Sequence, residues 1–163
     1  GLKYEWKDGQ LEEAGDCMKA NERSIVANLS RRFASTGVYK TGAELFPETE
    51  CYLEAINATR IPDLAFFTSE QIAESREGHP VPRWVIEIIS PSDRVFAIED
   101  KAQEYFDSGV ELVWQVFPRF QKVSILKSIT DVVVLSGDQI CSAAPVLPEL
   151  EMTVADLFAD RRA

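Results

Sequence analysis

Glu87 is an acidic residue inside an otherwise apolar run, Arg83–Pro91, which has the composition of a buried strand. An ionised carboxylate that is removed from water is costly unless it is paired, protonated or bound to a metal ion. A core strand that carries such a charge therefore indicates a use for it. A second acid, Asp63, lies in the apolar run Ile61–Phe67, and Lys101 lies on a predicted helix just downstream. Two acids on adjacent apolar strands with a nearby lysine are what metal-dependent cleavage of a phosphodiester requires.

The alternation of side chains along a strand indicates how the two acids could meet. Glu87 shares a face with Val85 and Ile89, and Asp63 shares a face with Ala65 in its own strand. If the two strands are neighbours, their register can bring both carboxylates to one end of the sheet. Such carboxylates repel each other, and a Mg²⁺ or Mn²⁺ ion between them removes the repulsion, because hard divalent cations prefer oxygen ligands. Lys101 would orient or deprotonate a water molecule, or stabilise the charge on the phosphate.

Hydrophobic periodicity predicts the elements that position these residues. Alternation on both sides of Asp8-Gly9 predicts an N-terminal β-hairpin. Apolar residues spaced three or four apart predict one helix from about Met18 to Ser35 and a second from Val95 to Ser108. The predicted strands are Val38–Leu45, Thr49–Ile56, Arg60–Phe67, Trp84–Ser90, Glu111–Phe117, Lys122–Leu126, Asp131–Leu135 and Gln139–Ser142.

Two further segments complete the prediction. Thr68–Pro82 is polar and is predicted to be a loop that can include a turn of helix. The segment Pro145–Phe158 is expected to end in a short helix at Val154–Phe158. Together the elements predict a single α/β domain over residues 1–163, with a central mixed sheet flanked by helices. The segment Trp84–Phe117 is expected to form a right-handed crossover.

Composition excludes several classes of protein. Hydrophobic residues make up 45% of the 163 residues and charged residues 27%, which is typical of a soluble globular domain. The absence of a long apolar stretch or a secretory pattern predicts a cytoplasmic protein without a membrane span. The three cysteines lack CxxC spacing, and with a single histidine, His79, they argue against a zinc site. The net charge of −10 argues against a general nucleic-acid binder, although it does not exclude a nuclease.

Several motifs resemble those of one bacterial family. They are Arg60–Phe66 (RIPDLAF), Trp84–Asp93 (WVIEIISPSD), and Asp100-Lys101 followed by Tyr105 and Gly109-Val110. The opening Tyr4–Gly9 and the ending Leu147–Phe158 extend the similarity over nearly the whole chain. The chain thus resembles the Uma-two family of restriction-endonuclease-like domains, in the PD-(D/E)XK nuclease superfamily. The resemblance implies a restriction-endonuclease-like fold, a Mg²⁺ or Mn²⁺ cofactor, DNA as the substrate and a homodimer or higher homo-oligomer.

The resemblance also implies roles for individual residues. Asp63 and Glu87 correspond to the metal ligands, and Lys101 to the lysine that the family places on the following helix. The superfamily's usual lysine position, two residues after the glutamate, holds Ile89 here. A further acid often comes from the first helix, where Glu22 takes the position of a common histidine. Gln10 replaces a frequent acid after the hairpin glycine, and Glu13 is another candidate ligand.

Structural roles remain as alternatives for the same residues. Asp63 could cap a turn, Glu87 could form a buried ion pair with Arg83 or Arg60, and Glu22 could be an exposed acid in a first helical turn. Lys101 would then be a solvated helix residue, while Tyr105 is expected to pack in the core.

Three functions follow from these alternatives. The first is a metal-dependent DNA endonuclease with Asp63, Glu87 and Lys101 as its catalytic residues. The second is a catalytically weak binding or regulatory module that homo-oligomerises. The third is a metal-dependent hydrolase that acts on another substrate, because fold does not fix substrate.

Overall fold

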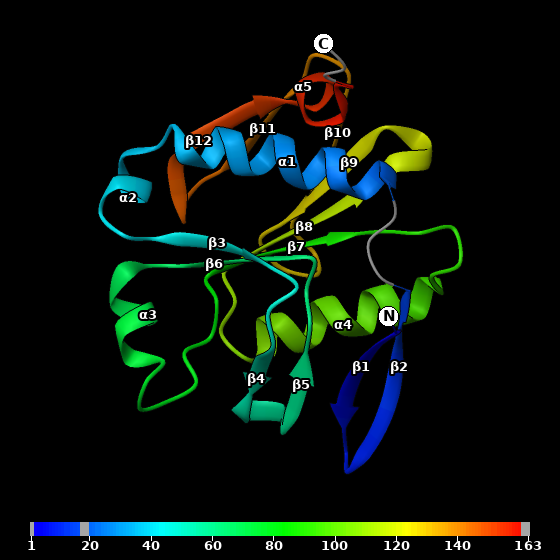
Figure 1. Ribbon diagram of the computed structural model, residues 1–163. Coiled ribbons are helices and arrows are strands. Elements are labelled where there is room, and N and C mark those ends of the chain that lie inside the picture. The colour runs from blue at the N-terminus through cyan, green and yellow to red at the C-terminus, as the bar shows by residue number, and fades with distance from the viewer. Residues whose placement is uncertain (1, 17–19, 161–163) are drawn as a thin grey trace.

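A computed structural model describes residues 2–16 and 20–160. Its centre is a six-stranded sheet with the strand order β10-β9-β8-β7-β6-β3 (Figure 1). The strands are β3 (Glu44–Pro47), β6 (Leu64–Phe67), β7 (Trp84–Ile88), β8 (Leu112–Phe117), β9 (Lys122–Leu126) and β10 (Val132–Ser136). β7 and β8 are parallel, and the other neighbours are antiparallel. The predicted mixed sheet and the α/β fold class are therefore confirmed.

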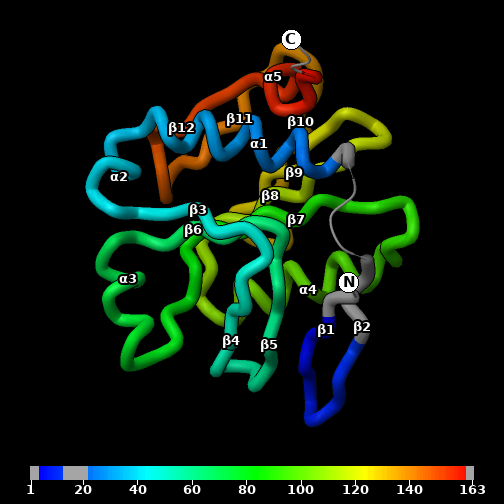
Figure 2. Tube along the Cα trace, in the orientation of Figure 1, coloured from blue at the N-terminus to red at the C-terminus, as the bar shows by residue number. Residues whose placement is uncertain are grey.

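Helices cover both faces of this sheet (Figures 1 and 2). α1 (Ala20–Ala34) lies over one face, together with α5 (Val154–Phe158) and a hairpin formed by β11 (Ile140–Ala143) and β12 (Leu147–Thr153). α4 (Val95–Asp107) covers the opposite face and connects the parallel strands β7 and β8.

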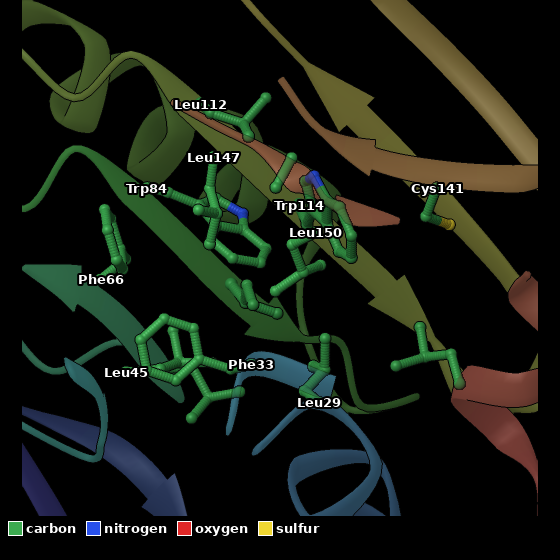
Figure 3. Close-up of a cluster of buried hydrophobic side chains, with 14 of the residues drawn as sticks. Leu29, Phe33, Leu45, Phe66, Trp84, Leu112, Trp114, Cys141, Leu147 and Leu150 are labelled. Atoms are coloured by element: carbon green, nitrogen blue, oxygen red, sulfur yellow. The ribbon is translucent and has the colours of Figure 1, made fainter. Parts of the chain in front are cut away.

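Each face of the sheet has its own apolar cluster, because side chains alternate along the strands. Trp84, Ile86 and Ile88 of β7 pack with α1 and β12, whereas Val85 packs with Ala102 and Tyr105 of α4. Figure 3 shows the first cluster, with Trp84 and Trp114 side by side. Their ring centroids are 4.8 Å apart at an interplanar angle of 64°, an edge-to-face contact. Glu87 therefore belongs to the α4 face, as its place in the strand predicts.

A second, four-stranded sheet has the order β2-β1-β5-β4. The predicted hairpin of β1 (Leu2–Lys7) and β2 (Gln10–Asp16) is confirmed, with Asp8 and Gly9 at positive φ in its turn. β1 pairs with β5 (Ala58–Arg60), which pairs in turn with β4 (Cys51–Leu53). The hairpin is thereby brought beside α4, on the same side of the central sheet (Figure 1).

The prediction of a strand over Val38–Leu45 is wrong for its first part. Gly37–Lys40 forms the short helix α2, and β3 begins only at Glu44. The side chain of Thr36 caps α2 by accepting a hydrogen bond from the Tyr39 backbone N–H. Glu149, which is more than 100 residues away, accepts bonds from the N–H groups of Gly37 and Val38. This distant carboxylate favours the helix and could not be identified from the local pattern.

Two other predicted strands are shorter in the structure or are divided into two. Thr49–Ile56 contains only the short strand β4 and then a 3₁₀ turn, Glu54–Ile56. The predicted strand Arg60–Phe67 is divided into β5 and β6 around Pro62, which lacks a backbone donor.

Two of the non-strand segments also contain more regular structure than predicted. The predicted loop after Phe67 contains the helix α3 (Ser69–Glu74), which starts with a capping box of Thr68 and Gln71. β12 lies in the segment Pro145–Phe158, for which only the terminal helix was predicted, and that helix is confirmed as α5. Within the described residues, no helix is long and apolar enough to cross a membrane. Met18 and Cys17 lie outside the described residues.

Candidate active site

Asp63 and Glu87 are brought together by the pairing of β6 and β7. Leu64 pairs with Ile86 in antiparallel register, so the residues on either side, Asp63 and Glu87, face each other at the end of the strand pair. The Asp63 Oδ2 atom accepts a 2.6 Å hydrogen bond from the backbone N–H of Ile88. Asp63 lies just before β6 and not within a strand as predicted. Its side chain nevertheless reaches β7, which excludes a role confined to its own turn.

These acids line a cavity of about 580 Å³ between the central sheet, α4 and the N-terminal hairpin. Lys101 of α4 and Glu22 of the first turn of α1 also line this cavity, so four of the sequence-predicted residues are lining residues of one cavity. Ile89, which stands where the superfamily has its usual lysine, also lines the cavity. Glu13 is placed in β2, but its side chain lies outside the described part of the structure.

Glu87 is held by two donors from α4. The Tyr105 hydroxyl donates a 2.6 Å hydrogen bond to Glu87 Oε1, and Lys101 Nζ lies 3.2 Å from the same oxygen. Tyr105 is fully buried, as expected of a core residue, but its hydroxyl has this additional role. Burial raises the pKa of Glu87, Lys101 lowers it and Asp63 raises it again, and the result is a pKa of about 7. The negative charge of Asp63 contributes to this rise in pKa by repulsion.

The arginine ion pairs proposed from the sequence are not formed with Glu87. Arg83 pairs with Glu111 at 2.8 Å on the surface, and Arg60 pairs with Glu5 at 3.1 Å and with Glu104 at 2.6 Å. The alternative of a buried pair between Glu87 and Arg83 or Arg60 is therefore not what the structure shows. The cation beside Glu87 is Lys101, so this lysine is not merely a solvated helix residue.

Lys101 bridges two carboxylates. Its Nζ atom lies 3.0 Å from Glu5 Oε1 in addition to its contact with Glu87. Burial lowers the pKa of Lys101, but Glu87 and Glu5 outweigh this effect, so the pKa lies above its ordinary value. Lys101 therefore stays protonated at neutral pH. Of the three roles that the sequence left open, orientation of water and stabilisation of negative charge fit this state, whereas removal of a proton does not.

Glu5 and Gln115 are site residues that the sequence analysis missed. Glu5 is 7% exposed, and it accepts hydrogen bonds from the backbone N–H of Ile61 and from Arg60, both at 3.1 Å. Gln115 is buried next to Glu87, because β7 and β8 pair in parallel at these two positions. The only sequence signal for Glu5 is its place in an alternating strand, and the signal for Gln115 is a polar residue inside the apolar run of β8.

The donor set at Asp63 and Glu87 fits a hard divalent cation. Both side chains offer carboxylate oxygens, and their repulsion would be relieved by a positive ion between them. No group of three or more His, Cys, Asp or Glu side chains is arranged as a metal site within residues 2–16 and 20–160. Mg²⁺ commonly uses one or two protein carboxylates and completes its octahedral shell with water and substrate oxygens. Two acids facing each other in an open cavity are sufficient for that mode of binding.

Similarity to known proteins identifies the family of the chain. The family model described as "Uma2: Putative restriction endonuclease" matches residues 1–155. The chain belongs to the Uma2 family. The resemblance inferred from the sequence motifs is thereby confirmed, and membership of Uma2 supports a nuclease. No curated protein matches the chain.

A solved structure supports the same fold for this Uma2 chain. The crystal structure of a "putative nuclease belonging to DUF820" from Anabaena variabilis superposes with a TM-score of 0.79 at 21% sequence identity. The match covers 95% of this chain and 89% of the other. At this identity the similarity establishes the fold alone.

The raised pKa of Glu87 predicts that the metal-free protein loses stability as the pH rises from 4.5 to 7. The unfolded carboxyl, with its ordinary pKa of 4.5, ionises in this window, whereas the folded carboxyl keeps its proton up to a pKa of about 7. Glu87 should therefore cost at most about 3 kcal/mol of folding free energy above pH 7, and nothing below pH 4.5. Glu87→Gln should lack this loss. Urea unfolding in EDTA across this pH range measures the difference.

The control for this prediction is Glu99→Gln, which changes an exposed acid of α4, the helix that follows β7. The curves of free energy against pH should be parallel for Glu99→Gln and wild type. Parallel curves for Glu87→Gln and wild type would contradict the prediction.

Proposed function

We propose that this chain is a Mg²⁺- or Mn²⁺-dependent endonuclease that hydrolyses phosphodiester bonds of DNA. The observation that carries the proposal is the pair Asp63 and Glu87, which face each other in one cavity with Lys101 beside them. Membership of a family described as restriction endonucleases supports the reaction class and DNA as the substrate. Asp63 and Glu87 are the proposed metal ligands, and Glu22 is a further proposed ligand at the cavity wall.

Each residue has a separate part in the proposed reaction. When bound, the divalent ion supplies positive charge to the phosphate and a lower pKa for its water ligand. Asp63 is held by the Ile88 N–H and Glu87 by Tyr105, so both carboxylates are fixed before the ion arrives. Lys101, held in its charged form between Glu87 and Glu5, orients the attacking water or stabilises the charge that develops on the phosphate.

A metal-dependent rise in thermal stability tests the ligand assignment. A ligand that binds only the folded state stabilises it by about 2.7 kcal/mol at a hundredfold excess over its Kd. For a domain of this size that corresponds to roughly 5–10 °C in the thermal midpoint. Mn²⁺ should raise the midpoint of wild type but not of Asp63→Asn, as measured by differential scanning fluorimetry. Asp138→Asn, a change at an exposed acid, should respond like wild type, and an equal shift in Asp63→Asn would exclude this site.

A second candidate function is a binding or regulatory module that homo-oligomerises and has weak catalysis. The observation that favours it is the edge strand β10, where Val132, Val133 and Val134 are 43%, 52% and 55% exposed. Edge strands usually carry charges, prolines or bulges that prevent pairing with another chain. Val132–Ser136 has none of these, and its register with β9 is regular. If the β10 strands of two copies of the chain paired antiparallel about Val134, Val133 of one copy would lie opposite Leu135 of the other.

Sedimentation velocity over a range of concentrations tests this association. Wild type should form a dimer, and Val133→Lys should be monomeric, because a charge on the strand opposes pairing. Val133→Thr keeps the shape of valine and should remain dimeric. A wild type that stays monomeric at the highest concentration, or a Val133→Lys that still dimerises, would reject β10 as the interface.

A further inference from the structure

The sheet face that carries Glu87 continues beyond the cavity. Val113 of β8 and Leu126 of β9 belong to the apolar cluster beneath α4, so Gln115 and Phe117 share this face with Val113. β8 and β9 pair with Phe117 opposite Lys122, which places Lys122 on the face of Leu126. The side chains of Gln115, Phe117 and Lys122 therefore lie on one face of the sheet, from the cavity lining at Gln115 to the end of β8. β7 and β8 are parallel, so the turn after β8 and the loop after β7 leave the sheet at the same end (Figure 1).

This turn combines one exposed aromatic ring, that of Phe120, and the part-buried ring of Phe117 with positive charge. Lys122 Nζ lies 4.8 Å from the ring centroid of Phe117 and 5.7 Å from that of Phe120, and the guanidinium carbon of Arg119 lies 5.7 Å from the Phe120 centroid. Phe120 is 67% exposed, which leaves most of its ring open to another partner. We call Phe117, Arg119, Phe120 and Lys122 the Phe120 surface. It is the combination of stacking platform and cations found in proteins that bind single-stranded nucleic acid.

The charge of the Phe120 surface differs from that of the chain. The chain has 27 acidic residues against 17 basic ones, yet residues 112–126 contain no Asp or Glu and two cations, Arg119 and Lys122. The only charged side chains that β8, β9 and their connection present to a phosphate backbone crossing this turn are therefore positive. The surface lies within about 15 Å of Gln115, since a strand advances roughly 3.3 Å per residue. A nucleic-acid strand could span that distance with a few nucleotides.

We propose that the Phe120 surface binds a single-stranded segment of DNA next to the cavity of Asp63 and Glu87. A base stacks on the exposed ring of Phe120, and Arg119 and Lys122 contact the adjoining phosphates. Stacking requires a base that is not paired, which makes a single strand the preferred partner over a duplex. Two cations are also too few for the broad phosphate footprint of duplex binding. The proposal rests on the proposed function, and it names the form of DNA that the same site accepts.

Fluorescence anisotropy of a labelled oligothymidylate measures this binding in EDTA, where metal-dependent cleavage cannot occur. Phe120→Ala should weaken binding roughly tenfold, the amount expected for one lost base stack. Phe120→Trp should keep the wild-type affinity, because tryptophan can also stack on a base. Phe120→Leu should bind as weakly as Phe120→Ala, because leucine is apolar but cannot stack. Lys122→Gln should lower the affinity. It should also make the slope of the logarithm of the binding constant against the logarithm of the salt concentration shallower by about one unit. Lys127→Gln, at the other end of β9 and exposed, is the matched charge control and should bind like wild type.

Several outcomes would overturn the proposal. They are no measurable binding at low salt, equal losses in Lys127→Gln and Lys122→Gln, wild-type affinity in Phe120→Ala, or a duplex that binds more tightly than the single strand. Tighter binding of a single-stranded RNA of the same length would also reject DNA as the partner. Thermal midpoints of all variants establish that they are folded.

The experiment separates this proposal from the proposed function. If Phe120→Ala loses binding while wild type shows no cleavage of any DNA, the Phe120 surface stands and the nuclease assignment falls. If wild type cleaves DNA and Phe120→Ala binds and cleaves normally, the nuclease assignment stands and the Phe120 surface falls.

Discussion

Glu87→Gln should reduce nicking of supercoiled plasmid by at least about 100-fold in Mg²⁺ or Mn²⁺, as expected when a group that stabilises the transition state is lost. Glutamine keeps the shape of the side chain but removes the negative charge that a hard cation requires. The Tyr105 hydroxyl can still donate to the amide oxygen at this position, so the fold should be retained. Conversion of supercoiled to nicked plasmid, followed on agarose gels, gives the rate.

Three further measurements make this result specific. Lys101→Met should lose nicking to a similar degree, because the cation beside Glu87 is removed. Glu99→Gln, an exposed change on the same helix as Lys101, should nick at the wild-type rate, and EDTA should stop all cleavage. Nicking by Glu87→Gln at the wild-type rate would show that the acids of this cavity are not the catalytic groups. Metal binding without nicking in wild type would favour the regulatory module.

The sequence was sufficient where local pattern and burial agree. The β7 run is apolar on both faces except at Glu87, so one polar residue in a predicted strand pointed to the candidate site. The same reasoning placed Trp84, Ile86 and Ile88 on the opposite face, and the structure places these three in the cluster beneath α1. Such strands can be predicted because alternation fixes which side chains share a face.

The rest of the site depends on contacts between distant segments. Glu5 and Arg60 are separated by 55 residues, and they meet only because β1 pairs with β5 beside α4. Lys101 also contacts Glu5 through this arrangement. Nothing near Glu5 in the sequence distinguishes it from the other charges of the hairpin. The helix α2 was missed for the same reason, since the distant Glu149 supplies acceptors for its first N–H groups.

Arg60 should be the charged residue whose loss most destabilises the fold. It is 5% exposed and lies between two acids, with Glu5 at 3.1 Å and Glu104 at 2.6 Å. Removal of one partner from a buried ion pair costs about 3–5 kcal/mol, because the remaining charge is buried without compensation. Lys101 still faces Glu5 and Lys7 still faces Glu104, so Arg60→Met should cost about 3 kcal/mol, at the low end of that range.

Urea unfolding at pH 7.5 measures this cost, and Arg83→Met provides the matched control. The Arg83–Glu111 pair has a similar length of 2.8 Å, but its side chains are 40% and 45% exposed. Exposed pairs contribute at most about 1 kcal/mol, so Arg83→Met should be nearly neutral. The ion pairs of Arg60 are with Glu5 and Glu104, which are not proposed metal ligands, so its effect should appear first in stability. Equal costs for the two variants would mean that the hairpin does not depend on this network for its position over the cavity.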